Sequence, residues 1–146
     1  MSAKQVAALP IKVTKRGKIK ILLITSRETR RWIVPKGWPM DGKKPWRAAE
    51  IEALEEAGIK GDIARKKLGT FRYRKRLKNG TRLPCKVALF PMSVETEKKK
   101  WRERKERSRK WFSAKAAARA VDEPELKDLI RAIAKKPEIV AALITD

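Results

Sequence analysis

Three glutamates within one helical turn, followed by a glycine, constrain this chain more than any other feature. Glu52, Glu55 and Glu56 stand at positions i, i+3 and i+4, and Gly58 comes soon after them. On an α-helix these positions share one face, where like charges repel by roughly a few tenths of a kcal/mol per pair. A divalent cation offsets that repulsion, whereas a solvated acidic surface is the alternative. Because 39 Lys and Arg outnumber 17 Asp and Glu, this local cluster of acids favours a cation site.

The residues before these glutamates predict a strand and a loop that lead into the helix. Residues 31–37 read Arg-Trp-Ile-Val-Pro-Lys-Gly, a short apolar strand that ends in a Pro/Gly turn. Residues 38–44 then form a loop, and Pro45 is suited to the first position of a helix. The sequence therefore predicts a strand, a glycine loop and an acid-bearing helix in succession.

This succession resembles the Nudix hydrolase box, Gx5Ex7REUxEExGU, in which U is an aliphatic residue. The positions that match in register are Gly37, Glu52, Glu55, Glu56, Gly58 and Ile59. Lys43 replaces the first glutamate of the box, Ile51 replaces its arginine, and Ala53 is a small substitute for the aliphatic residue. The flanks WIVPKGW and EEAGIKG, and the later Trp-Phe-Ser, are similar to the branch that hydrolyses diphosphoinositol polyphosphates and dinucleoside polyphosphates.

The resemblance covers most of residues 6–133 and implies both a fold and an activity. The expected fold class is α/β: a single Nudix-like domain over residues 1–146, built as an α/β/α sandwich around a mixed β-sheet. The expected activity is Mg²⁺- or Mn²⁺-dependent hydrolysis of a phosphoanhydride bond. By resemblance, Glu52 and Glu56 are metal ligands, and the Gly37 carbonyl completes the shell. Glu55 is a further ligand or the catalytic base, and Glu52 is the other catalytic candidate.

The departures from the box affect how its carboxylates are held. In the family the arginine orients a box carboxylate through a charge-assisted hydrogen bond, which Ile51 cannot donate. The substitution Ile51→Arg is therefore expected to raise the rate or leave it unchanged. The family often recruits another acid from a later loop, and the candidates here are Glu95, Glu97 and Glu103.

Composition excludes several kinds of active site and bears on where the protein works. The chain has no histidine, which excludes Ser-His catalysis and His-ligated zinc. A single cysteine, Cys85, allows no internal disulfide and fits a reducing cytoplasm. The N-terminus lacks a signal pattern, and no apolar run reaches the ~20 residues of a membrane helix. We therefore expect a cytoplasmic protein without a membrane span, whose oligomeric state the sequence leaves open.

A net charge of +22 predicts a strongly anionic partner. A polyphosphorylated small-molecule substrate satisfies this expectation, and nucleic acid is a second possibility. The alternative function is a non-catalytic or weakly active Nudix-fold protein that binds RNA or polyphosphate through its basic surface. In that case Trp101 and Tyr73 would offer rings for base stacking.

One strand pair is predicted before the box helix in the sequence, and a second pair after it. Residues 6–13 and 18–26 form the first pair, and residues 63–67 are a connector after the helix. Residues 68–77 and 82–90 form a hairpin around Asn79-Gly80. A three-residue loop over 78–80, with Gly80 left-handed, is preferred because it keeps the core residues on one face.

This register gives the hairpin a basic face and an apolar face. It pairs Arg76 with Arg82, Arg72 with Lys86, Phe71 with Val87 and Tyr73 with Cys85. The basic face carries Arg72, Arg74, Arg76, Arg82 and Lys86. The predicted substrate-binding residues are Lys36, Arg31, Arg72, Arg74, Arg76 and Lys86. A solvated strand surface is the alternative interpretation of this basic face.

The last third of the chain is predicted to be a basic loop followed by helices. Residues 94–110 are a solvated, mobile loop or a short charged helix. Residues 110–112 form a short strand, and Ser113 caps the first of the C-terminal helices (113–146). Asp122 and Glu125 form a capping box for the next helix, and an apolar stripe over 139–144 predicts the last one.

Overall fold

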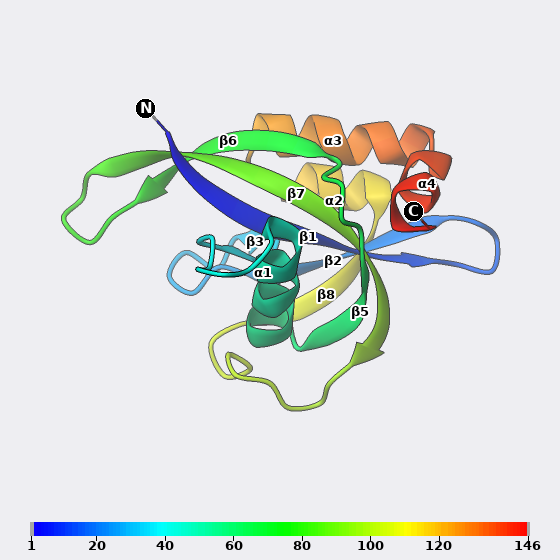
Figure 1. The fold of residues 1–146 in the computed structure, drawn as a ribbon, viewed down its shortest axis with the longest axis horizontal. Coiled ribbons are helices and arrows are strands. Elements are labelled where there is room, and N and C mark those ends of the chain that lie inside the picture. The colour runs from blue at the N-terminus through cyan, green and yellow to red at the C-terminus, as the bar shows by residue number, and fades with distance from the viewer. Residues whose placement is uncertain (1, 146) are drawn as a thin grey trace.

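A strongly bent β-sheet with helices on both sides forms the core of the computed structural model, which describes residues 2–145 (Figure 1). The strands are β1 (Ala3–Val13), β2 (Ile19–Thr25), β3 (Trp32–Ile33), β4 (Lys36–Gly37), β5 (Ile59–Ile63), β6 (Gly69–Arg76), β7 (Arg82–Glu97) and β8 (Arg109–Ser113). The helices are α1 (Pro45–Glu52), which continues into a π-helical turn (Ala53–Ala57), α2 (Ala114–Ala120), α3 (Pro124–Lys135) and α4 (Glu138–Thr145). Residues 1 and 146 of the predicted domain lie outside the described residues.

The sheet is mixed, as predicted. Its main strand order is β3-β2-β1-β7-β5, with β4 paired to β1, β6 to β7 and β8 to β2. The long central strands β1 and β7 run parallel to each other, and β1 pairs antiparallel with both β2 and β4. The register Val6↔Gly37 places the glycine of the box directly beside the middle of the sheet.

Both faces of the sheet are buried, which confirms the sandwich. Side chains alternate between the faces along a strand, so Val6 and Ala8 of β1 pack with α1. Ala7 and Leu9 point the other way, into a second cluster with α2 and α3. Figure 1 shows α1 on one side of the sheet and the C-terminal helices on the other.

The predicted hairpin register is confirmed at every pair. Arg76 lies opposite Arg82, Arg72 opposite Lys86, Phe71 opposite Val87 and Tyr73 opposite Cys85. The Leu77 amide donates to the Thr81 carbonyl at 2.9 Å, which leaves residues 78–80 as a three-residue loop. Gly80 has a φ of 86°, a left-handed conformation that glycine adopts without strain. Phe71, Cys85 and Val87 are buried, and Tyr73 and Leu83 are half-buried.

Several strand boundaries differ from those predicted. The segment 31–37 is two short strands, β3 and β4, separated by buried Val34 and Pro35. Strand β7 continues to Glu97, so residues 94–97 belong to the sheet and not to the basic loop. Strand β5 was not predicted; it ends at Ile63, where the predicted connector begins, and its pairing with β7 shifts register between Lys60 and Gly61.

The C-terminal helices form largely as predicted. The Ser113 hydroxyl accepts a hydrogen bond of 3.1 Å from the Ala116 amide and caps α2. The capping box predicted at Asp122 and Glu125 is wrong: α3 begins at Pro124 without a side-chain cap. Glu125 instead accepts hydrogen bonds from the backbone and guanidinium of Arg72.

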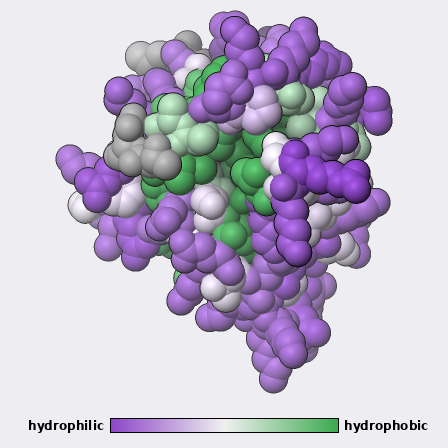
Figure 2. Space-filling model, turned by 90° about the vertical axis from the view of Figure 1, so that its right-hand side faces the viewer, coloured by the Kyte–Doolittle hydropathy of each residue, from purple (hydrophilic) through white to green (hydrophobic). Residues whose placement is uncertain are grey.

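No helix among the described residues is long and apolar enough to cross a membrane. On the side where α4 and the β1–β2 turn lie, hydrophilic side chains surround a smaller apolar area (Figure 2). The exposed apolar side chains of the described residues include Val13 and Ile139.

Candidate active site

Gly37 of the sheet lies directly against Glu52 of the box helix. Pro45 occupies the first turn of α1, and buried Ala48 and Ala49 let the helix lie close to the sheet. A Cβ atom on Gly37 would stand 2.0 Å from Oε2 of Glu52. Any side chain at this position would therefore displace the Glu52 carboxylate, so the glycine is needed for space.

The helix widens immediately after Glu52, because residues 53–57 form a π-helical turn. Such turns are rare and occur frequently at functional sites. Gly58 then ends the helix in the left-handed conformation, with a φ of 68°. Glu55 is half-exposed and lies 3.3 Å from Arg102, whereas Glu56 is buried. The single acidic face expected from α-helical spacing is thus wrong in detail, since the last two acids have different surroundings.

Glu56 is held from two directions. Its Oε1 accepts a hydrogen bond of 3.1 Å from the Lys36 amide of β4. Its Oε2 lies 3.5 Å from Nη2 of Arg107, whose side chain is 6% exposed. Because Lys36 immediately precedes Gly37, the same short strand positions both Glu52 and Glu56.

Arg107 also brings the acid of a later loop to the box. Its Nε donates to Oε1 of Glu103 at 2.8 Å, and its Nη1 donates to the Thr25 carbonyl at 3.0 Å. The Glu103 amide donates to the Glu55 carbonyl at 3.2 Å. Of the three acids predicted as additional candidates, Glu103 is therefore the one that lies at the box.

The other two candidate acids lie elsewhere. Glu97 forms an ion pair with Lys12 and accepts a hydrogen bond from Trp111, which holds its pKa below the usual range. Glu95 is exposed on β7. Glu97 is therefore engaged away from the box carboxylates.

The carboxylates of the site repel one another in a partly desolvated place. Burial, and then the charges of Glu56, Glu55 and Glu103, raise the pKa of Glu52 to about 7. Burial also raises the pKa of Glu56 to about 7, although Arg107 and the Lys36 amide act in the opposite direction. It is therefore unfavourable for Glu52 and Glu56 to be ionised at the same time. A cation bound between them would favour their ionised forms.

The donor chemistry fits a hard divalent cation. Within residues 2–145, no three Asp, Glu, His or Cys side chains already converge as a formed metal site. The available donors are nevertheless all oxygens, namely the carboxylates of Glu52, Glu55 and Glu56 and the Gly37 carbonyl. Hard cations prefer such donors, and the Glu52 carboxylate occupies the space that a side chain on Gly37 would fill.

A basic groove of about 870 Å³ reaches Glu56 of the box, and Glu56 and Arg107 are among its lining residues. Positive side chains dominate the remainder of the lining: Arg27, Arg31, Lys36, Arg72, Arg74, Lys75, Arg76, Lys78 and Arg82. Its other acids are Glu28, Asp122 and Glu123. The groove is therefore suited to a large anion that ends at the box.

The groove brings together most of the predicted substrate-binding residues. Arg31 donates to buried Glu123 at 3.1 Å, and the Lys36 ammonium lies 5.0 Å from the centre of the Tyr73 ring. Burial lowers the pKa of Lys36 to about 8, while Glu123 and Glu56 act to raise it. Both cations thus stand at the inner part of the groove.

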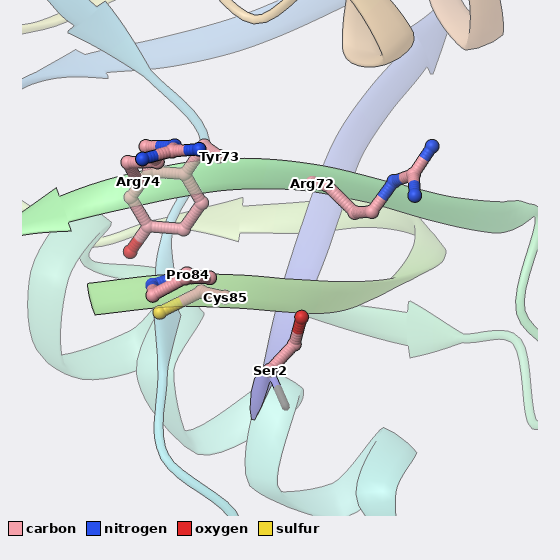
Figure 3. A pocket seen from close by; sticks show the side chains of 6 residues that line it. All are labelled: Ser2, Arg72, Tyr73, Arg74, Pro84 and Cys85. Atoms are coloured by element: carbon pink, nitrogen blue, oxygen red, sulfur yellow. The ribbon is translucent and has the colours of Figure 1, made fainter. Parts of the chain in front are cut away.

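The hairpin residues are less uniform than predicted. Arg72 forms an ion pair of 2.9 Å with Glu125 of α3, and Figure 3 shows its guanidinium group extended away from the other labelled side chains. Arg74 and Arg76 are exposed and line the groove. Lys86 is exposed on the same face of the hairpin but is not part of the lining.

Sequence reasoning missed the way in which residues 98–108 fold against the box. The Trp101 ring packs on Gly58, where a Cβ atom would stand 2.6 Å from the ring, and its Nε1 donates to the Glu56 carbonyl. The guanidinium of Arg109 lies 4.0 Å from the centre of the same ring. The only sequence signal was the single tryptophan within a charged run, which is more typical of packing than of a solvated loop.

Comparison with known proteins agrees with this geometry. A sequence model of the NUDIX domain matches residues 3–133. The chain is 33% identical over 104 residues to Nudix hydrolase 12, mitochondrial, of Arabidopsis thaliana, covering 69% of this chain and 51% of that protein. It is 31% identical over 103 residues to diphosphoinositol polyphosphate phosphohydrolase 3-beta of Bos taurus, covering 69% and 58%. The chain thus spans about half the length of these relatives.

The fold is also similar to that of solved structures. A binary complex of an Ap4A hydrolase from C. elegans superposes with a TM-score of 0.67 at 24% identity, covering 96% of this chain and 98% of that one. This likeness supports the arrangement of strands and helices described above.

Proposed function

This chain belongs to the Nudix family, and we propose that it hydrolyses a phosphoanhydride bond in a highly anionic substrate. The observation that carries the proposal is that Glu52 lies against Gly37, while Glu56 accepts a hydrogen bond from the preceding Lys36 amide and lines a basic groove. The expected substrate is a diphosphoinositol polyphosphate or a dinucleoside polyphosphate. Among the chain's relatives are a phosphohydrolase named for the first class and, by fold, a hydrolase of Ap4A.

In this proposal Glu52 and Glu56 hold Mg²⁺ or Mn²⁺, with Glu55 and the Gly37 carbonyl as further ligands. When bound, the cation would neutralise phosphoryl oxygens and lower the pKa of a bound water. The raised pKa values of Glu52 and Glu56 support this assignment, because both carboxylates gain from a neighbouring positive charge.

The residues of the groove bind and orient the substrate. Lys36 and Arg31 lie beside Glu56 and Glu123 at the inner end, where they would contact the phosphoryl groups nearest the bond that breaks. Arg74 and Arg76 of the hairpin would hold more distant phosphates. Charge-assisted hydrogen bonds from such side chains fix phosphate positions more strongly than neutral ones do.

The reaction itself needs a group to accept a proton. A water oxygen forms a bond to one phosphorus while the bond from that phosphorus to the bridging oxygen breaks. The water proton passes to a carboxylate, for which Glu55 and Glu52 are the candidates. Glu55 is half-exposed and faces Arg102, so it is accessible to water from the loop side.

A panel of substrates tests this function. Purified protein would be incubated with a diphosphoinositol polyphosphate, a dinucleoside polyphosphate and a single-stranded RNA, with Mg²⁺ or with a chelator, and products separated by ion-exchange chromatography. We expect cleavage of at least one pyrophosphate-containing substrate with Mg²⁺ only. Tight binding of RNA without cleavage of any substrate would favour the alternative, a binding protein with a non-catalytic box.

A further inference from the structure

The arginine of the Nudix box is missing from α1, yet a buried arginine from another element stands at the box carboxylates. Ile51 occupies the position of that arginine and is half-buried. Arg107 comes from the loop between β7 and β8, and its side chain is 6% exposed. It is one of seven Lys and Arg residues in 98–108, and it alone among them is classed as buried.

Every edge of the Arg107 guanidinium meets an acceptor. Nε donates to Glu103, Nη1 to the Thr25 carbonyl, and Nη2 lies 3.5 Å from Glu56. The planar fork thereby fixes the distance between two acids that repel each other. A lysine ammonium is a point charge and could not meet three separated acceptors in one plane.

The loop that carries Arg107 is itself anchored. The Ser108 amide donates to the Thr25 hydroxyl at 2.9 Å, and the Thr25 amide donates to the Ser108 carbonyl at 3.0 Å. Because these bonds tie the loop to the end of β2 without touching a carboxylate, the loop does not need Arg107 as its only fastening.

We propose that Arg107 is the positioning residue of this box: it orients Glu56 for metal binding and holds Glu103 beside it, in place of the arginine absent at Ile51. This inference rests on the proposed function, since the orientation matters only if the acids hold a cation. Outer contacts that orient metal-binding carboxylates typically change metal affinity by about 10–100-fold when they are removed.

A different role for Arg107 gives the opposite expectation. If its positive charge merely substitutes for the cation, then removing it leaves Glu56 and Glu103 more attractive to a metal, and affinity rises. If Arg107 orients the acids, then removing it lets them separate, and affinity falls. The direction of the change therefore separates positioning from charge compensation.

The test measures Mn²⁺ affinity by isothermal titration calorimetry on metal-stripped protein, together with near-ultraviolet circular dichroism to confirm folding. The variants are Arg107→Met, Arg107→Lys and two controls. Lys105→Met removes an exposed charge from the same loop. Thr25→Val removes the hydroxyl that accepts from Ser108 and so loosens the loop without changing the contacts of the acids.

We expect Arg107→Met to weaken Mn²⁺ binding by about tenfold or more, with Lys105→Met and Thr25→Val close to the wild type. If Arg107→Met fails to fold, Arg107→Lys decides the matter, because it keeps the charge and loses the fork; weaker binding is again expected. Unchanged or tighter binding in the folded variant would overturn the proposal, as would equal weakening by Thr25→Val. Absence of Mn²⁺ binding by the wild type would overturn the proposed function as well.

Discussion

Replacing Gly37 with alanine is expected to damage activity far more than stability. The φ of Gly37 is not in the left-handed region, so alanine can adopt the same backbone. The new Cβ would stand 2.0 Å from Oε2 and 2.4 Å from Cδ of Glu52. The carboxylate must therefore move, while the backbone around it need not.

The size of this movement follows from van der Waals contact. Ordinary contact begins near 3.4 Å, so the Glu52 carboxylate would have to shift by about 1.4 Å. A misplacement of about 1 Å in a catalytic group can lower a rate by roughly 100-fold. Glu52 is half-buried and its end is flexible, so the free energy of unfolding should change by only about 1 kcal/mol, typical of a single substitution.

The assay compares kcat for pyrophosphate cleavage with the thermal melting temperature. Gly69→Ala is the matched control, because its Cβ would stand 2.7 Å from a methyl group of Leu129, also a movable side-chain end, in the core beneath α3. We expect Gly37→Ala to lose about two orders of magnitude in kcat and Gly69→Ala to keep its kcat. Full activity in Gly37→Ala would refute the assignment of Glu52 to the site.

Three further predictions concern charge and pH. Arg74→Ala should raise KM about tenfold for a highly phosphorylated substrate, the loss expected for one charge-assisted contact, and less for a substrate with few phosphates; equal small effects would leave Arg74 as a solvated surface residue. In metal-free protein, Glu52 and Glu56 have pKa values raised to about 7, so their protonated forms stabilise the fold fully at acidic pH, and that stabilisation is lost as pH rises through 7. Melting temperatures measured from pH 5 to 8 should therefore fall, and they should fall less in the Glu52→Gln variant. An equal fall in that variant would contradict the assignment of these pKa values. The sequence predicted that Ile51→Arg would raise the rate or leave it unchanged; because Arg107 already meets Glu56, no gain is now expected, and kcat should stay unchanged or fall. A clear increase in kcat would show that the box lacked an orienting donor.

The hairpin shows where sequence alone was sufficient. Shifting one strand of a hairpin by one residue moves every side chain to the opposite face, so only one register could bury Phe71 with Val87. The left-handed preference of Gly80 agreed with the same register. Local turn chemistry and core burial thus selected one answer, and the structure confirms it.

The box was predictable in composition and less so in geometry. The positions of Gly37, Glu52 and Glu56 followed from the match to the family pattern. Glu52 lies against Gly37 and Glu56 accepts a hydrogen bond from the Lys36 amide, and their role as metal ligands stays a prediction. The π-helical turn over 53–57 did not follow, because a single extra residue in a turn leaves no clear periodic signal. Its consequence, that Glu55 and Glu56 have different surroundings, follows only from the fold.

The contribution of residues 98–108 was beyond sequence reasoning. Nothing local distinguishes Arg107 from Arg102 or Arg104, since all three alternate with glutamates in one charged run. The distinction is tertiary: only Arg107 meets the Thr25 carbonyl and the box at once. The capping box at Asp122 failed for a similar reason, because Arg72 of the distant hairpin recruits Glu125.

The most direct test of the central claim is the Mg²⁺-dependent turnover of a diphosphoinositol polyphosphate by Glu56→Gln, compared with Glu95→Gln. Both variants neutralise one glutamate, but Glu56 is buried at the box and Glu95 is exposed on β7. Phosphate release would be followed with and without a chelator, with circular dichroism confirming the fold. The account predicts that Glu56→Gln loses nearly all turnover while Glu95→Gln keeps it. Undiminished, Mg²⁺-dependent turnover in a folded Glu56→Gln protein would contradict the account.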